Sequence, residues 1–238
     1  MRASDFEFKN RFWIIAVIFW ASFWLYFLDK QNAGAALSRW IGRWNGWTID
    51  SNFHVVMGIA TVIAFCAVGI RVWATSYLHK DVMSDFKLHS DRLVADGPYR
   101  HVRNPLYIGT ILIGVAMAPL ASRLGAVSLV TLLFVFTLRL IGREEAELKA
   151  AQGESYARFL AMVPKLVPTL KAQGEPSGAK PQWGQAIVGE GFIITFALAV
   201  LVMAVTENLK AFWGCIVAGF AVAIVTHWRW GPKEEKKS

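Results

Sequence analysis

The sequence of 238 residues has few of the side chains that hold metal ions or form disulfides. It has two cysteines and five histidines, and no two histidines stand in an HxxH or HxxxH spacing. Membrane di-iron enzymes need many more histidines than this, so we expect no metal site. Cys66 and Cys215 lie inside apolar runs without a CxxC pair, and we interpret them as packing residues.

A dinucleotide-binding fingerprint is missing as well. The sequence contains no GxGxxG, and its nearest fragment, Gly189-Glu190-Gly191, is too short to indicate that fold. Acidic residues are outnumbered by basic ones, 17 against 25, and the net charge is +8. A basic chain can bind nucleic acid, so the distribution of these charges decides what they mean.

Apolar residues dominate the chain, at 55% of the total, and they are gathered in six runs. The runs are Phe12–Leu28, Phe53–Ile70, Pro105–Ser122, Leu124–Leu138, Phe192–Thr206 and Ala211–Trp228. Several are shorter than the roughly 20 residues that an upright membrane helix needs, but short spans can thin the bilayer or recruit flanking residues. We therefore predict an all-α, polytopic membrane helical bundle with about six transmembrane helices.

The basic residues lie mostly on one side of this predicted topology. With both termini in the cytoplasm, 18 of the 25 Lys and Arg fall in cytoplasmic segments and five fall opposite. This asymmetry follows the positive-inside rule, and it explains the net charge without nucleic acid. We expect a multi-pass protein of the membrane with both termini and the loop before Pro105 in the cytoplasm.

Only Arg123 and its neighbours separate the third and fourth runs, which predicts a tight helical hairpin at residues 105–141. The hairpin returns the chain to the side it left. It therefore brings Glu144 and Glu145 close to the loop that carries Arg100 and Arg103. In that loop Gly97-Pro98 indicates a turn, and Pro105 suits the first turn of a helix. Gly109 and Gly114 permit close approach of another helix or of a ligand.

A site with both signs of charge at a helix N-terminus would suit a zwitterionic cofactor. S-adenosylmethionine has a carboxylate that Arg103 or the helix start could hold, and an ammonium that Glu144 or Glu145 could accept. An aromatic side chain could cover its adenine. The same residues could equally form salt bridges between the loop and the helix without any ligand.

Several short motifs in order carry a family resemblance over roughly residues 90 to 170. They are Gly97-Pro98-Tyr99-Arg100, Arg103-Asn104-Pro105-Leu106-Tyr107-Ile108-Gly109, Arg143-Glu144-Glu145 with Leu148, then Gly153, Tyr156 and Val163-Pro164-Lys165 with Pro168. Together they resemble the isoprenylcysteine carboxyl methyltransferase and phospholipid methyltransferase family. The resemblance implies an enzyme that uses S-adenosylmethionine and methylates a lipophilic acceptor from the bilayer at the membrane–cytosol interface.

By this resemblance we assign catalytic roles to Arg103, Asn104, Tyr107 and Glu145. The expected cofactor-binding residues are Gly97, Pro98, Tyr99, Arg100, His101, Arg103, Asn104, Pro105, Tyr107, Gly109, Glu144, Glu145 and Tyr156. The family often has Arg-His-Pro where this chain has Arg103-Asn104-Pro105. Because Asn cannot act as a base, a carboxylate acceptor is slightly favoured over an amine.

Four parts follow from this interpretation. Residues 1–89 hold N-terminal membrane helices, 90–172 the methyltransferase-like core, 173–185 a linker, and 186–238 the C-terminal membrane helices and a basic tail.

Two other functions stay open. Membrane sterol reductases are similar in the C-terminal part and use a nicotinamide cofactor, and a lipid-binding protein without catalysis could keep the same scaffold.

Overall fold

The computed structural model describes residues 1–78, 96–176 and 178–230. Within these residues the regular structure is helical, and no strand forms there. The α-helices are α1 (Asp5–Lys9), α2 (Arg11–Trp24), α3 (Ala33–Asn45), α4 (Ile49–Ser76), α6 (Pro105–Met117), α7 (Arg123–Gln152), α8 (Glu154–Met162), α9 (Trp183–Gly189), α10 (Gly191–Thr206) and α11 (Leu209–Trp230). Short 3-10 helices are η1 (Leu25–Phe27), η2 (Gly97–Arg100) and η3 (Ala118–Leu120). The predicted all-α bundle is confirmed.

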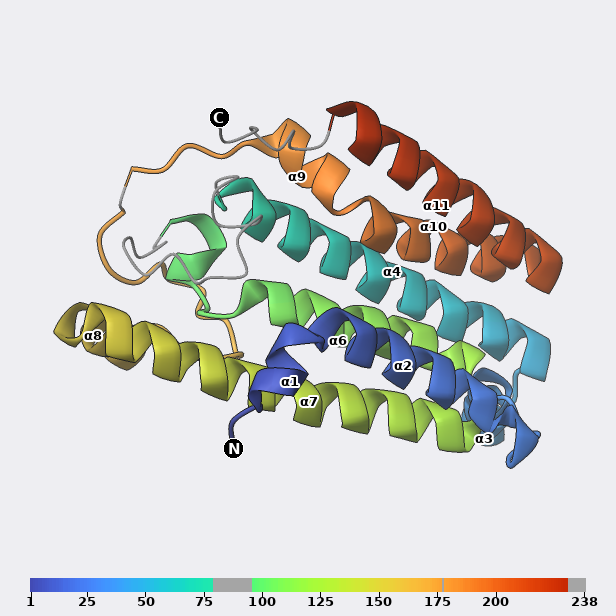
Figure 1. Ribbon diagram of the computed structural model, residues 1–238. Helices are drawn as coiled ribbons and strands as arrows, with labels where there is room; N and C mark the ends of the chain where they lie inside the picture. The colour runs from blue at the N-terminus through green and yellow to red at the C-terminus, as the bar shows by residue number, and fades with distance from the viewer. Residues whose placement is uncertain (79–95, 177, 231–238) are drawn as a thin grey trace.

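Helix α4 occupies the middle of the bundle (Figure 1). It packs against α6 on one side and α10 on the other, α7 packs against α2 and α6, and α11 packs against α10. Alanines on α4 let its neighbours approach closely, because Ala60, Ala64 and Ala67 are buried against residues such as Ile113 of α6 and Val200 of α10. The core is thus built around one small-residue helix.

The helical hairpin predicted at residues 105–141 is present. α6 ends at Met117, η3 contains Pro119, and α7 begins at Arg123 after Ser122, whose hydroxyl accepts a hydrogen bond from Gly125 N at 3.0 Å. A serine before the first helical residue satisfies one of the free N–H groups there, which explains why α7 starts immediately after the turn. The N-terminus of α6 and the C-terminus of α7 lie at the same end of the bundle as η2 and α8 (Figure 1).

In the described part of the chain, three helices are long and apolar enough to cross a membrane: α4, α7 and residues Leu209–Thr226 of α11. α9 and α10 qualify as a pair, but the chain bends by 67° between them. Two shorter apolar helical stretches, Arg11–Phe27 and Pro105–Leu120, account for the remaining predicted runs. Length and composition thus support three or four spans, and the count of six stays a prediction.

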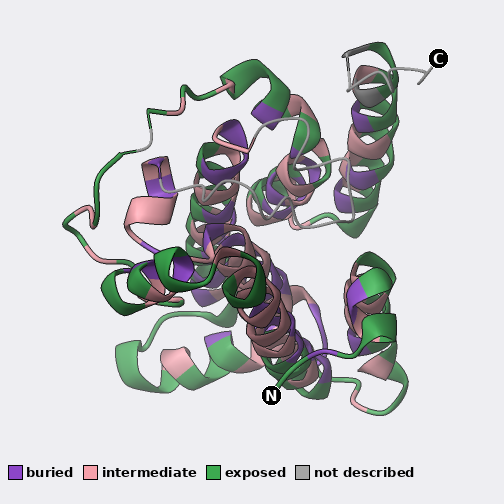
Figure 2. Ribbon diagram, turned by 60° about the vertical axis from the view of Figure 1, so that its left-hand side comes forward, coloured by how far each residue is buried: buried purple, intermediate pink, exposed green. Residues whose placement is uncertain are grey.

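The outer surface of the bundle is apolar. Figure 2 shows buried residues on the inward faces of the helices and exposed ones outside. Large exposed side chains include Trp13, Trp20, Val62, Val127 and Trp213, from four different helices. A soluble monomer rarely exposes so much apolar surface, whereas the bilayer solvates it.

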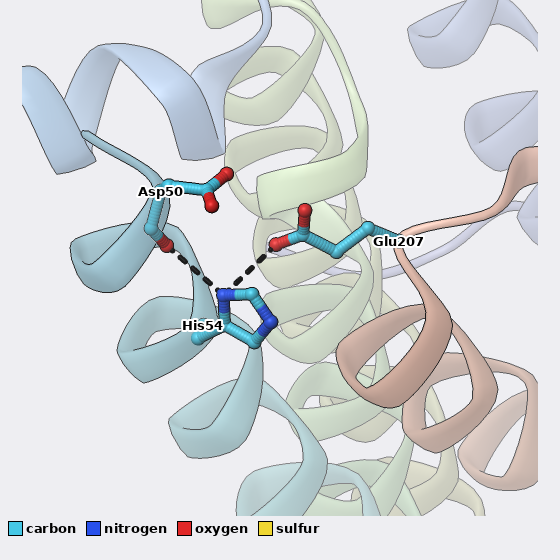
Figure 3. Close-up of side chains that lie close together, drawn as sticks. All are labelled: Asp50, His54 and Glu207. Atoms are coloured by element: carbon cyan, nitrogen blue, oxygen red, sulfur yellow. Dashed lines mark hydrogen bonds and ion pairs between the residues drawn. The ribbon is translucent and has the colours of Figure 1, made fainter. Parts of the chain in front are cut away.

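Ion pairs tie the end of the bundle away from η2. Arg123 Nη2 lies 3.2 Å from Asp29 Oδ1, and His54 Nδ1 lies 3.1 Å from Glu207 Oε1. Asp50 lies beside His54 and Glu207 (Figure 3). Each of the three side chains has one atom of a kind that can bind a metal ion, and these atoms lie within 4.8 Å of one another. Asp50 and His54 are exposed to solvent, so we treat this group as an ion pair between α4 and the α10–α11 turn.

Candidate active site

The loop before α6 begins with a tight turn at Gly97. Its φ is +54°, and a β-carbon there would collide with the ring of Tyr77 on α4. Glycine is therefore required for two reasons: the backbone has a positive φ, and the Tyr77 ring leaves no room for a β-carbon. Pro98 is buried, and its carbonyl accepts hydrogen bonds from His101 N and Val102 N at 2.9 and 3.0 Å. The turn thus fixes the direction in which the following residues enter α6.

Arg103 is the centre of the predicted polar cluster. Its guanidinium donates from Nη1 to Leu160 O at 2.9 Å and faces Glu145 Oε1 from Nη2 at 3.3 Å. Its backbone N–H donates to Pro164 O at 2.9 Å. One residue therefore joins the loop, the end of α7 and the segment after α8.

Glu145 also pairs with Lys165, whose Nζ lies 3.1 Å from Glu145 Oε2. Asn104 Nδ2 donates to Lys165 O at 3.1 Å. The sequence left open which of the two adjacent glutamates faces the loop, and the structure brings Glu145 to Arg103. Glu144 points elsewhere and accepts a hydrogen bond from Tyr107 OH at 2.7 Å.

Two buried polar atoms in this cluster have no hydrogen-bond partner among the residues that the structure describes: Arg103 Nε and Glu145 Oε1. The side chains to which they belong are 11% and 15% exposed. An unsatisfied buried donor or acceptor costs roughly 1–3 kcal/mol, so such atoms in a native protein call for an explanation. Here a donor of the cation makes no hydrogen bond, and the anionic oxygen beside it makes only the ion pair with Arg103 Nη2 at 3.3 Å.

Tyr156, the aromatic residue expected at the site, is buried close to this cluster. Burial raises the pKa of the Tyr156 phenol to about 12, and the Glu145 carboxylate contributes in the same direction. Burial also raises the pKa of the Tyr99 phenol, with a further contribution from Glu144. Both phenols are therefore neutral at physiological pH and can act as hydrogen-bond donors.

A cavity of about 400 Å³ opens beside the same loop. Trp73 and Tyr77 of α4 line it together with Asp96, Arg100 and His101 of the loop. The rings of Trp73 and His101 lie 5.9 Å apart. Asp96 is 4% exposed, which makes it a buried carboxylate at the edge of an aromatic cavity.

Residues 169–176 and 178–182 run back along this loop and line part of the cavity. Thr169 N donates to His101 O at 3.0 Å, Gln173 N to Arg100 O at 2.8 Å, and Ala179 N to Asp96 Oδ2 at 2.9 Å. The Arg100 side chain also donates a hydrogen bond from Nη2 to Gly174 O at 2.6 Å. The segment that composition marked as a linker thus forms part of the cavity wall.

Most of the predicted residues fall into three groups. Arg103, Asn104, Glu145 and Tyr156 lie in or beside the ion cluster, Tyr107 pairs with Glu144, and Gly97, Arg100 and His101 line the cavity. Pro98 and Pro105 are buried backbone anchors. Gly109 has a different neighbour, because a β-carbon there would collide with the side chain of Arg71.

Sequence reasoning missed Trp73, Tyr77 and Asp96. Asp96 directly precedes the Gly97 turn, and this position next to the strongest motif was a signal that could have found it. Trp73 lies at the end of α4 and Tyr77 directly after it, 24 and 20 positions before Gly97, and no local pattern connects them to the loop.

Residues 53–154 match the model of the phospholipid methyltransferase family. The matched segment runs from α4 to the start of α8, so it contains Arg103, Tyr107 and both glutamates. Comparisons with curated proteins and with solved structures found no match. The family match supports a membrane methyltransferase, while the likeness to isoprenylcysteine carboxyl methyltransferases in particular stays a prediction.

Proposed function

We propose that the protein transfers the methyl group of S-adenosylmethionine to a lipophilic acceptor at the membrane–cytosol interface. One observation carries the proposal: Arg103 Nε and Glu145 Oε1 are buried, have no hydrogen-bond partner in the described part of the chain, and lie inside the segment that matches a methyltransferase family. Arg103 would hold the carboxylate of the cosubstrate, and Glu145 would accept its ammonium group. These are charge-assisted hydrogen bonds of the strong kind.

The adjoining cavity would take the adenosyl part. Its volume of about 400 Å³ suits a nucleoside, and Trp73 and His101 supply ring faces for the base. Asp96 has a carboxylate oxygen that could accept a hydrogen bond from a ribose hydroxyl. His101 bridges the two subsites along the chain, since it stands two residues before Arg103.

The chemistry is an in-line displacement. A nucleophilic atom of the acceptor forms a bond to the methyl carbon, the carbon–sulfur bond breaks, and S-adenosylhomocysteine leaves. A carboxylate acceptor arrives ionised and becomes a methyl ester with no proton to remove, so positioning and exclusion of water are the main requirements. Asn104 cannot act as a base, and this favours a carboxylate over an amine.

Binding and labelling experiments test the proposal. Purified protein in lipid nanodiscs is titrated with S-adenosylhomocysteine and, in parallel, with a reduced nicotinamide dinucleotide. We expect saturable binding of the first alone. Incubation with native lipid extract and methyl-labelled S-adenosylmethionine should then give a labelled lipid, whose base-labile methyl would identify an ester. Binding of the nicotinamide dinucleotide alone, or no labelled product together with no binding, would refute the proposal.

A further inference from the structure

A buried ion pair connects α4 to the bend between α9 and α10. Arg71 Nε lies 2.6 Å from Glu190 Oε2, and Arg71 Nη2 donates to Glu190 Oε1 at 3.1 Å. Thr75 Oγ1 donates to the same carboxylate at 2.6 Å. The Arg71 side chain is 19% exposed and that of Glu190 5%. Glu190 lies outside the segment that matches the family.

The same guanidinium also binds the first turns of α6. Arg71 Nη1 donates to Leu106 O at 3.1 Å and to Thr110 Oγ1 at 2.9 Å. Gly109 leaves the space for the Arg71 stem, since a β-carbon there would overlap it. α6 is therefore held in place along the face that carries Leu106 and Thr110, next to Tyr107 in the chain.

Stability alone does not explain this arrangement. An arginine within a span and a carboxylate at a break in another are expensive to place in an apolar bundle. Replacing a buried ion pair with apolar side chains of similar size is often neutral or stabilising, whereas removing one partner is costly. What the pair supplies is geometry, because the planar guanidinium fixes three elements in one orientation.

We propose that Arg71 and Glu190 are positioning residues that orient the first turn of α6, and with it Asn104 and Tyr107, for methyl transfer. The inference rests on the proposed function. It makes α9 and α10, which follow the family-matched segment, part of the catalytic unit. Glu190 reaches the reacting groups through Arg71 and Leu106 O and does not touch the substrates itself.

A double replacement separates geometry from stability. Arg71→Met with Glu190→Met removes both charges while keeping apolar bulk. We expect a melting temperature equal to or above that of the wild type. We also expect turnover to fall about tenfold or more, with the KM of the acceptor within about twofold. A purely structural ion pair would leave turnover unchanged once the fold is kept.

The matched control is the ion pair at the other end of the bundle, removed by Asp29→Asn with Arg123→Gln. It should leave turnover at the wild-type value. If the Met variant does not fold, Glu190→Gln keeps the shape of the side chain and removes only its charge. Turnover within twofold of wild type in either folded variant would overturn the inference.

The two proposals can fail separately. Wild-type protein that binds no S-adenosylhomocysteine and labels no lipid would overturn the proposed function and this inference with it. Wild-type activity that persists in the folded double variant would overturn the inference alone. Arg71→Lys adds a further check. Lysine keeps the charge but cannot bind Glu190, Leu106 O and Thr110 at once, so turnover of this variant should also be well below that of wild type.

Discussion

Replacing Arg103 by Met should weaken binding of S-adenosylhomocysteine without unfolding the protein. The change keeps the apolar stem and removes the guanidinium, whose Nε is buried without a partner and whose Nη1 donates to Leu160 O at 2.9 Å. A hydrogen bond to a charged group contributes roughly 1.5–3 kcal/mol. Its loss corresponds to roughly a ten- to a hundredfold rise in Kd. Glu145→Gln should give a rise of the same order.

Isothermal titration calorimetry on nanodisc-embedded protein measures these constants, and melting temperatures check the fold. Since Arg103 Nη2 and Glu145 Oε1 lie 3.3 Å apart, the two changes are coupled, and the double variant should lose less affinity than the sum of the single losses. Lys165→Met removes a partner of Glu145 that is 43% exposed, so its effect should be smaller. Asp29→Asn, at the opposite end, is the control and should bind as wild type does.

The reasoning would be refuted by two folded variants, Arg103→Met and Glu145→Gln, that both bind S-adenosylhomocysteine within twofold of the wild-type Kd. In that case the cluster would be a set of salt bridges between the loop and α7, which is the alternative that the sequence left open.

Three other outcomes are expected. Gly97→Ala places a side chain at φ +54° against the ring of Tyr77. It should lower the free energy of unfolding by about 1–3 kcal/mol, and with it the melting temperature, and it should weaken S-adenosylhomocysteine binding. Hydrogen bonding to Arg139 lowers the pKa of Glu7 to about 2 from 4.5, so its contribution is complete above pH 4.5 and is lost as the pH falls toward 2; melting temperatures over this range should fall more steeply for wild type than for Glu7→Gln. A cysteine at Gly178 should react with an impermeant thiol reagent only after cells are opened, and labelling of intact cells would contradict the cytoplasmic placement of this segment.

The positions of the helices could largely be predicted from the sequence because they depend on local features. Pro105 begins α6 and a serine precedes α7, and apolar runs on both sides of Arg123 leave no room for more than a turn. The meeting of Arg103 and the glutamate pair follows from that hairpin. The turn at Arg123 reverses the chain, and α7 is long enough to reach the loop that carries Arg103.

The rest depends on how helices rotate and where loops travel. Glu144 and Glu145 are about 100° apart around α7, and only the packing of α7 on α2 and α6 decides which one faces Arg103. Arg71 and Glu190 are 119 positions apart, and neither lies in a motif. Gly109 permits the close approach of a helix or of a ligand, and nothing in the sequence predicts that the Arg71 stem lies against it.

The wall of the cavity at residues 169–176 and 178–182 is attached mainly through its backbone. Thr169 N and Gln173 N donate to the carbonyls of His101 and Arg100, and Gln182 N donates to Ser76 O at 2.7 Å. Every residue except proline supplies the same N–H group, so these contacts place little demand on which side chains stand there. Gly174 and Gly178 are exceptions, because their positive φ values favour glycine. A family profile built on residue identity has little to detect in such a segment, which fits a match that stops at residue 154 while the cavity continues beyond it.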